Sequence, residues 1–279
     1  MKSLSLSFIL WALLASTLAH NAIADPEADR LALRALYEKR FPDIHLDAHV
    51  DGAYALDEAK REQWLEMEDF PPYEFTVDDG QTLYDTAFAT GKTYADCLGP
   101  DAPAVKQHFP RFDTVSGQVV TLEQTVNQCR RDNGEAEYEY MSAEMNAITA
   151  YIAYQSRGEK IDVVIPDDPR ALAAYESGKE FFYERRGQLN FSCSSCHVQM
   201  SGNMLRAERL SAALGQVTHW PAYRFRWEEV GSLHRRFMQC NTQVRAEPLR
   251  AQSEMYRNLE YFMTYMSNTM ELNGPSSRK

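Results

Sequence analysis

The chain has 279 residues, of which 44% are apolar and 11% aromatic, enough for about two globular domains with buried cores. Its 40 acidic and 29 basic side chains give a formal net charge of −11, and it has no long run of lysine or arginine, so we expect no nucleic-acid partner. The mean hydropathy of −0.49, without a second long apolar run, argues against a protein with several membrane spans.

Residues 1–24 are predicted to be a secretory signal peptide. Lys2 supplies a positive charge, the stretch from Leu4 to Leu18 is almost wholly apolar or small, and Ala22-Ile23-Ala24 has small residues where a signal peptidase reads. The apolar stretch is shorter than the ~20 residues that a membrane anchor needs, so cleavage after Ala24 is favoured over an uncleaved anchor. The mature chain would then have no membrane span and would work outside the cytoplasm, where disulfides persist.

Cys97 and Cys129 are the only cysteines of the first half. In an oxidising compartment two otherwise unassigned cysteines are expected to bond to each other, and two separate buried thiols are the alternative. The bridge would close a loop of about 33 residues, which loop-entropy models value at roughly 3–4 kcal/mol.

Two helices are predicted in the second half. Asp167-Asp168-Pro169 combines an N-cap with an early proline and opens a helix through about Tyr183, in which Gly178 would allow the close approach of a crossing helix. A terminal helix is predicted from about Glu254 to Glu271. It carries a stripe of tyrosine, phenylalanine and methionine, which we interpret as core packing.

Between these helices, Cys193-Ser194-Ser195-Cys196-His197 has the C-x-x-C-H spacing of covalent c-type haem attachment. Two thiols one helical turn apart can form thioethers with both haem vinyl groups, and the next histidine is placed to ligate the iron. A thioredoxin-like dithiol would open a helix after a strand, and no strand pattern precedes Cys193. A zinc site would need a second Cys or His pair at matching spacing. We therefore predict one covalently bound haem c, attached to Cys193 and Cys196, with His197 as an axial ligand.

The predicted fold is all-α, with two cytochrome c-like domains of which the first has no haem. Gly80–Tyr84 precedes Cys97 much as Gly178–Phe182 precedes Cys193, but neither a second cysteine nor a histidine follows Cys97. The boundary is expected in the turn-rich stretch 157–169, which gives domains at residues 25–160 and 161–279.

Cys240 is the one cysteine left over. On a helix it would share a face with Arg236, four residues earlier. A guanidinium beside a thiol favours the thiolate, which attacks sulfur and binds metal, and its fork of N–H donors can hold a sulfonate or sulfate. An ordinary buried cysteine is the alternative.

With the haem motif at 193–197, RFMQCN at 236–241 and VRAE at 244–247, the second half resembles SoxA, the catalytic cytochrome subunit of periplasmic thiosulfate oxidation. The resemblance implies that Cys240 is both the second axial ligand of the haem iron and a persulfide-forming nucleophile, and that Arg236 binds substrate. Many members of that family carry a second haem motif in the first half. This sequence lacks it and is similar to the single-haem subtype, in which a disulfide takes its place.

The resemblance further implies an L-cysteine S-thiosulfotransferase that works in the periplasm. Thiosulfate would be joined oxidatively to a cysteine of a SoxYZ-like sulfur-carrier protein, with the release of two electrons. Cys240 would pass the sulfur on through a mixed disulfide or persulfide, by thiol–disulfide exchange. A small SoxX-like c-type cytochrome subunit would take the electrons.

Two other functions remain open from the sequence. A simple periplasmic electron-transfer cytochrome would use Met200, Met204 or Met238 as the sixth ligand, or His219 or His234 in a bis-histidine haem. A structural subunit, whose haem only supports an interface, would keep its activity after the loss of Cys240.

Overall fold

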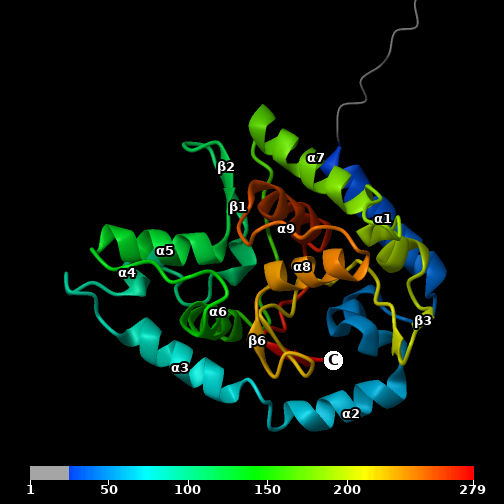
Figure 1. Ribbon diagram of the computed structural model, residues 1–279, viewed down its shortest axis with the longest axis horizontal. Coiled ribbons are helices and arrows are strands. Elements are labelled where there is room, and N and C mark those ends of the chain that lie inside the picture. Colours follow the sequence, from blue (N-terminus) through cyan, green and yellow to red (C-terminus); the bar gives the residue numbers. More distant parts are fainter. Residues whose placement is uncertain (1–24) are drawn as a thin grey trace, which may run out of the picture.

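The computed structural model describes residues 25–279, so the predicted signal peptide at residues 1–24 lies outside the described residues. Helices form most of the regular structure (Figure 1). In chain order the elements are α1 (Pro26–Arg40), η1 (Leu46–Leu56), α2 (Glu58–Glu68), α3 (Glu74–Asp85), α4 (Tyr94–Leu98), η2 (Lys106–His108), β1 (Arg111–Asp113), β2 (Gln118–Val120), α5 (Leu122–Asp132), α6 (Ala143–Gln155), α7 (Pro169–Tyr183), η3 (Ser195–Gln199), β3 (Met204–Leu205), β4 (Glu208–Arg209), β5 (Ala222–Arg224), β6 (Glu229–Gly231), α8 (Leu233–Gln243), α9 (Glu254–Met266) and β7 (Ser276–Arg278).

Two hydrophobic cores divide the molecule. The first is built mainly by α3 to α6, and the second by α7 to α9 together with α1, whose Leu33 and Tyr37 are buried in it. Figure 1 shows α3 to α6 gathered on one side, with α1, α7 and α9 on the other. The N-terminal segment therefore packs against the second half, although it precedes the first half in the sequence. The boundary at 160/161 stays a prediction.

Each core is organised by one close crossing of two helices at a glycine. A Cβ atom added to Gly80 of α3 would lie 2.0 Å from the backbone oxygen of Ala147 in α6. A Cβ added to Gly178 of α7 would lie 2.0 Å from the backbone oxygen of Asn258 in α9. No side chain fits in either place, so both glycines are required by the contact between helix backbones. The predicted close approach at Gly178 is confirmed.

The two halves repeat the same order of elements. The hairpin β1–β2 leads to the N-cap Thr121 and to α5, and the hairpin β5–β6 leads to the N-cap Ser232 and to α8. Cys129 is the eighth residue of α5, and Cys240 is the eighth residue of α8. The two cysteines thus occupy equivalent positions.

The ends of α5 and α8 are also equivalent. The Glu135 N–H donates to the Arg130 carbonyl at 2.9 Å, and the Ala246 N–H donates to the Asn241 carbonyl at the same distance. The preceding residue in each case has a positive φ. This internal repeat is much more extensive than the short sequence similarity that predicted it.

The predicted helices are confirmed with one correction. The first begins at Pro169, capped by Asp168, whose side chain accepts from the Arg170 N–H, and it ends at Tyr183. The terminal helix begins at Glu254 as predicted but ends at Met266, before the predicted end at Glu271. The chain turns there because the residues that follow form backbone hydrogen bonds to the segment at 159–161.

The all-α prediction is confirmed for the cores, but short strands also occur in residues 25–279. β5 pairs antiparallel with β6 and parallel with β7, and the β1–β2 and β3–β4 ribbons are two-stranded. These strands have only two or three residues, too few for an alternating pattern to be visible in the sequence.

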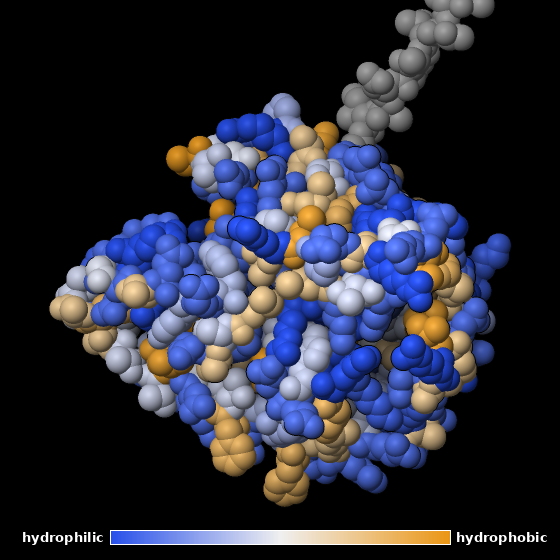
Figure 2. All heavy atoms as spheres, viewed as in Figure 1, coloured by the Kyte–Doolittle hydropathy of each residue, from blue (hydrophilic) through white to orange (hydrophobic). Residues whose placement is uncertain are grey.

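The surface in Figure 2 is mostly hydrophilic, in agreement with the acidic composition, with a few hydrophobic side chains projecting from it. Among residues 25–279, no helix has the length and apolar character needed to cross a bilayer.

Candidate functional site

The segment around Cys193 and Cys196 forms a tight turn held by serines. The Ser192 N–H donates to the Ser195 hydroxyl oxygen and the Ser195 N–H donates to the Ser192 hydroxyl oxygen, both at 3.1 Å. This reciprocal pair fixes the residue before each cysteine. Both thiols are free and half-buried. The turn therefore presents two neighbouring thiols, as covalent haem attachment requires.

His197 is held through its Nδ1 atom. Nδ1 lies 3.1 Å from the Ser211 carbonyl oxygen, and the Gln216 side-chain nitrogen is also within 2.5 Å of it. Burial, with a smaller contribution from the charge of Arg236, lowers the pKa of His197 to about 4 against the opposing effect of the Ser211 hydrogen bond. The ring is therefore neutral, and when Nδ1 donates to Ser211, Nε2 keeps its lone pair for a metal.

Helix α1 supports the motif from the far end of the sequence. The Tyr37 hydroxyl donates to the His197 carbonyl at 2.6 Å and accepts from the Ala213 N–H at 2.9 Å. Arg40 donates to the Val198 carbonyl and, at 2.7 Å, to the Ser201 hydroxyl. No local sequence pattern predicts these supporting residues, because they are identified only by contacts between segments about 160 residues apart.

Helix α8 brings the predicted Arg236 and Cys240 to one face. Ser232 caps the helix by accepting from the Arg235 N–H, and Arg236 donates to the Gln239 side chain at 2.6 Å. Cys240 is a free, half-buried thiol. The two side chains follow each other one helical turn apart, as the spacing predicts.

Charge effects relate Arg236 and Cys240 of α8 to the cysteines of the Cys193–His197 motif. Burial, together with the charge of Cys240, raises the pKa of the Cys193 thiol to about 12. Burial and Cys240 likewise raise the pKa of Cys196, whereas Arg236 lowers it. Since such charge effects weaken with distance, Arg236 and Cys240 lie within electrostatic range of the Cys193–His197 motif.

Three of the five alternative sixth ligands are less well placed. His234 is 1% exposed, its Nε2 lies 3.0 Å from a Glu260 carboxylate oxygen, and its Nδ1 accepts from the Gln252 N–H. Its Nδ1 is thus occupied, and its Nε2 faces a carboxylate. Met204 is 52% exposed on β3, and Met238 lies two residues before Cys240 on α8, which turns it to the other side of the helix.

The last two predicted cysteines meet in the first half. Cys97 of α4 and Cys129 of α5 form a disulfide with Cα atoms 5.7 Å apart, so this pairing is confirmed. The Asn133 side chain lies near both sulfurs, at 3.7 and 3.9 Å. The first half therefore uses its helix cysteine for a covalent bridge.

Comparison with known proteins gives matches over most of the chain. The family described as SoxA/TsdA, cytochrome c domain, matches residues 79–161 and 177–272. A curated protein of Allochromatium vinosum, L-cysteine S-thiosulfotransferase subunit SoxA, is 52% identical over 92% of this chain and 91% of its own length. The protein of the same name from Chlorobaculum tepidum is 48% identical over 93% of this chain and 90% of its own. The crystal structure of SoxXA from P. pantotrophus has a TM-score of 0.71 and 32% identity, and the match covers 78% of this chain and 84% of that one.

Proposed function

This chain belongs to the SoxA/TsdA cytochrome c family, and on that premise we propose that it acts as the SoxA-type subunit of an L-cysteine S-thiosulfotransferase. The proposal is supported by the free, half-buried thiols of Cys193, Cys196 and Cys240 and by the position of Arg236 and Cys240 within electrostatic range of the Cys193–His197 motif. The names of the relatives favour this function over a simple electron carrier.

We propose a single haem c, bound through thioethers to Cys193 and Cys196, with His197 and Cys240 as its axial ligands. The residues present fit this group, since both thiols are free and His197 Nδ1 is held so that Nε2 is left for the iron. When bound, the haem supplies a centre that accepts electrons one at a time.

The internal repeat supports Cys240 as the second ligand. In the first half, the cysteine at the same helix position reaches across to the segment that corresponds to the haem motif and bonds to Cys97. A sulfur at this position of α8 therefore faces the motif segment. The disulfide stands where a first-half haem would otherwise hold α4 and α5 together.

The substrate-binding role falls to Arg236 and the nucleophilic role to Cys240. The planar guanidinium can hold the sulfonate oxygens of thiosulfate with two parallel N–H donors, next to the sulfur that reacts. Overall, a carrier thiol and thiosulfate form one S–S bond and release one proton and two electrons. Cys240 would relay the sulfur as a mixed disulfide or persulfide before the carrier thiol takes it over.

The partners follow from the electron count. One haem holds one electron, so two electrons require a second redox centre, for which we propose a small SoxX-like c-type cytochrome. The solved relative is a SoxXA structure. A SoxYZ-like sulfur-carrier protein would dock transiently to present its cysteine. We propose that the complex works in the periplasm, after cleavage at Ala24, with domains at residues 25–160 and 161–279.

Replacement of Cys240 by methionine tests the catalytic assignment. Cys240→Met should keep the covalent haem, because the thioethers and His197 remain, but it should change the haem spectrum and abolish thiosulfate conjugation. Met238→Leu, on the other side of the same helix, is the matched control and should retain activity. If Cys240→Met left turnover intact, the simple electron carrier would be the better assignment.

Arg236→Lys separates substrate binding from iron ligation. Lysine keeps the charge but loses the planar fork, so the KM for thiosulfate should rise while the haem spectrum stays that of the unchanged protein. A changed spectrum with an unchanged KM would contradict the substrate-binding role.

A further inference from the structure

Three groups of the turn at residues 211–218 surround one ring nitrogen of His197. The Ser211 carbonyl oxygen lies 3.1 Å from Nδ1, and the Ser211 hydroxyl oxygen lies 3.3 Å from it. The side-chain amide of Gln216 is closer still, with its nitrogen 2.5 Å from Nδ1 and 3.1 Å from the Ser211 hydroxyl oxygen. Gln216 follows His197 by 19 residues, so no local pattern in the sequence pairs the two side chains.

The main chain at Gln216 is fixed by contacts with other segments. Gly215 has a φ of +75°, and a Cβ added to it would lie 2.5 Å from the His49 carbonyl oxygen, so only glycine fits there. The Gly215 N–H donates to the Ser267 hydroxyl at 3.2 Å, and the Trp220 indole N–H donates to the Gln216 carbonyl at 3.0 Å. Contacts with η1 and with the end of α9 therefore hold the turn in place.

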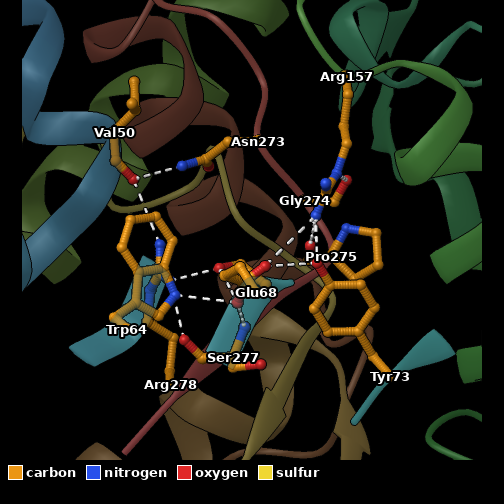
Figure 3. Close-up of polar contacts among 11 residues, drawn as sticks. Val50, Trp64, Glu68, Tyr73, Arg157, Asn273, Gly274, Pro275, Ser277 and Arg278 are labelled. Atoms are coloured by element: carbon orange, nitrogen blue, oxygen red, sulfur yellow. Dashed lines mark hydrogen bonds and ion pairs between the residues drawn. The ribbon is translucent and has the colours of Figure 1, made fainter. Parts of the chain in front are cut away.

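The far end of the turn is held as well. The Thr218 hydroxyl donates to the Gly215 carbonyl at 2.9 Å, and the Asn273 N–H donates to the Thr218 carbonyl at 3.1 Å. The Asn273 side chain in turn donates to the Val50 carbonyl at 3.0 Å (Figure 3). The backbone that carries Gln216 is thus anchored on both sides, and this places the Gln216 side chain beside His197.

The proton on His197 decides which atom of the amide can face the ring. With the iron at Nε2, a neutral imidazole carries its proton on Nδ1, which can then only donate. An amide nitrogen is also a donor, whereas the amide oxygen can accept this proton. A half-turn of the amide exchanges the two atoms and lets the oxygen accept from Nδ1 and from the Ser211 hydroxyl. Within residues 25–279 no hydrogen bond to the Gln216 side-chain oxygen is found, so the half-turn breaks none at that atom.

We propose that Gln216 is a positioning residue for the iron ligand, with its side-chain oxygen as a second acceptor, beside the Ser211 carbonyl, for the Nδ1 proton of His197. Two acceptors fix the orientation of the ring and make Nε2 a stronger electron donor to the iron, which favours the ferric state. Gln216 thereby lowers the potential at which the site takes up an electron. This inference rests on the proposed haem with His197 as ligand but not on the sulfur chemistry.

The test compares two changes at Gln216 with the same two changes at Gln199. Gln216→Leu removes the acceptor, and Gln216→Glu replaces it with a charged acceptor. Gln199 is exposed and lies two residues after His197, so Gln199→Leu and Gln199→Glu control for an apolar and a charged substitution near the motif. Intact mass establishes that each protein carries its haem, and the absorption spectrum establishes that the axial ligands are kept. The midpoint potential is then measured without thiosulfate.

We expect Gln216→Leu to shift the ferric–ferrous equilibrium about tenfold toward the ferrous state, which raises the potential by about 59 mV for a one-electron couple. Gln216→Glu should lower the potential, because a carboxylate is the stronger acceptor. Gln199→Leu should leave the equilibrium within about twofold of the original, and Gln199→Glu should lower the potential less than Gln216→Glu, because an exposed charge is screened.

A lowered or unchanged potential in Gln216→Leu would overturn the proposal, since removal of a donor to Nδ1 would lower the potential and removal of a group without influence would leave it unchanged. If Gln216→Leu does not retain its haem, the two glutamate variants decide, and equal potentials in Gln216→Glu and Gln199→Glu would overturn the role of Gln216. Absence of haem from the unchanged protein would contradict the haem proposal itself and is seen at the intact-mass step.

Discussion

The two halves of this protein share a framework and differ in what it holds. In both, helices cross at a glycine with backbone touching backbone, and a hairpin leads into a helix with cysteine as its eighth residue. In the first half that cysteine is bonded to Cys97, whereas in the second half Cys240 is free beside Arg236. The framework thus presents a sulfur, and the neighbouring residues decide whether that sulfur is structural or reactive.

The surroundings of the two helix cysteines make this difference concrete. Cys129 is 2% exposed, and Thr125, one turn before it, uses its hydroxyl to donate to the Thr121 carbonyl of its own helix. Cys240 is only half-buried and has Arg236 one turn before it. A charged group that can hold an anion therefore stands where the first half has a locally satisfied hydroxyl, and the sulfur at this position is more exposed to solvent than that of Cys129.

The shared framework predicts that both glycine crossings are indispensable. Gly178→Val and Gly80→Val would each push a side chain into the backbone of the crossing helix, which cannot move away without separating the core. We expect each variant to lose more than about 4 kcal/mol of unfolding free energy, measured by urea denaturation. Ala173→Val, on the exposed side of α7, controls for the branched side chain. A loss of unfolding free energy in only one of the two glycine variants would contradict the equivalence of the two halves.

The difference between the halves predicts that the disulfide matters for stability alone. The double variant Cys97→Ala/Cys129→Ala should lose roughly 3–4 kcal/mol of unfolding free energy, because the unfolded chain regains the freedom of the closed loop. It should still carry one haem and conjugate thiosulfate. Reduction of the unchanged protein should produce the same loss of stability, and no further loss in the variant. Loss of the haem from the variant would contradict the separation of roles.

Acid should weaken the second half more than the first. The buried histidines of residues 25–279, namely His49, His219 and His234, all pack with the second half, and burial lowers the pKa of His49 to about 4. Between about pH 6.5 and 4 the unfolded chain binds a proton at His49 that the folded chain does not, so stability is complete above this window and falls as the pH decreases. The loss should reach about 3 kcal/mol.

Hydrogen exchange at each pH would locate this loss. Amides of α7 and α9 should lose protection before those of α3 and α6. His49→Leu should remove this part of the pH dependence, whereas His45→Leu, at an exposed position, should leave it unchanged. Equal loss of protection in both halves would show that the acid sensitivity is not confined to the second.

Short-range patterns in the sequence predict several features of the fold and of the candidate site. The spacing in Cys193–His197, the cap at Asp168-Pro169 and the four-residue interval from Arg236 to Cys240 each concern neighbours in the chain, so the sequence predicts them directly. The early end of α9 was not predictable, because it depends on backbone bonds to a segment about 100 residues earlier. The packing of α1 on the haem motif is similarly a long-range contact.

The sequence also contains a stronger signal for the site. The same offset along the chain relates Cys129 to Cys240, Thr121 to Ser232 and Gln128 to Gln239. Alignment of the chain with itself at this offset would have placed Cys240 opposite the haem motif by analogy with the disulfide. Between the helices that begin each half, at Gly80–Tyr84 and Gly178–Phe182, the sequence similarity is confined to a few residues.

The central claim is that the second half carries the haem and a free helix cysteine, while the first half carries a disulfide. Intact mass spectrometry of the mature protein under non-reducing conditions, with alkylation of free thiols, tests this claim most directly. We predict one haem, no alkylation of Cys97 or Cys129 before reduction, and alkylation at both after reduction. Two haems, or alkylation of Cys97 and Cys129 without reduction, would contradict the account.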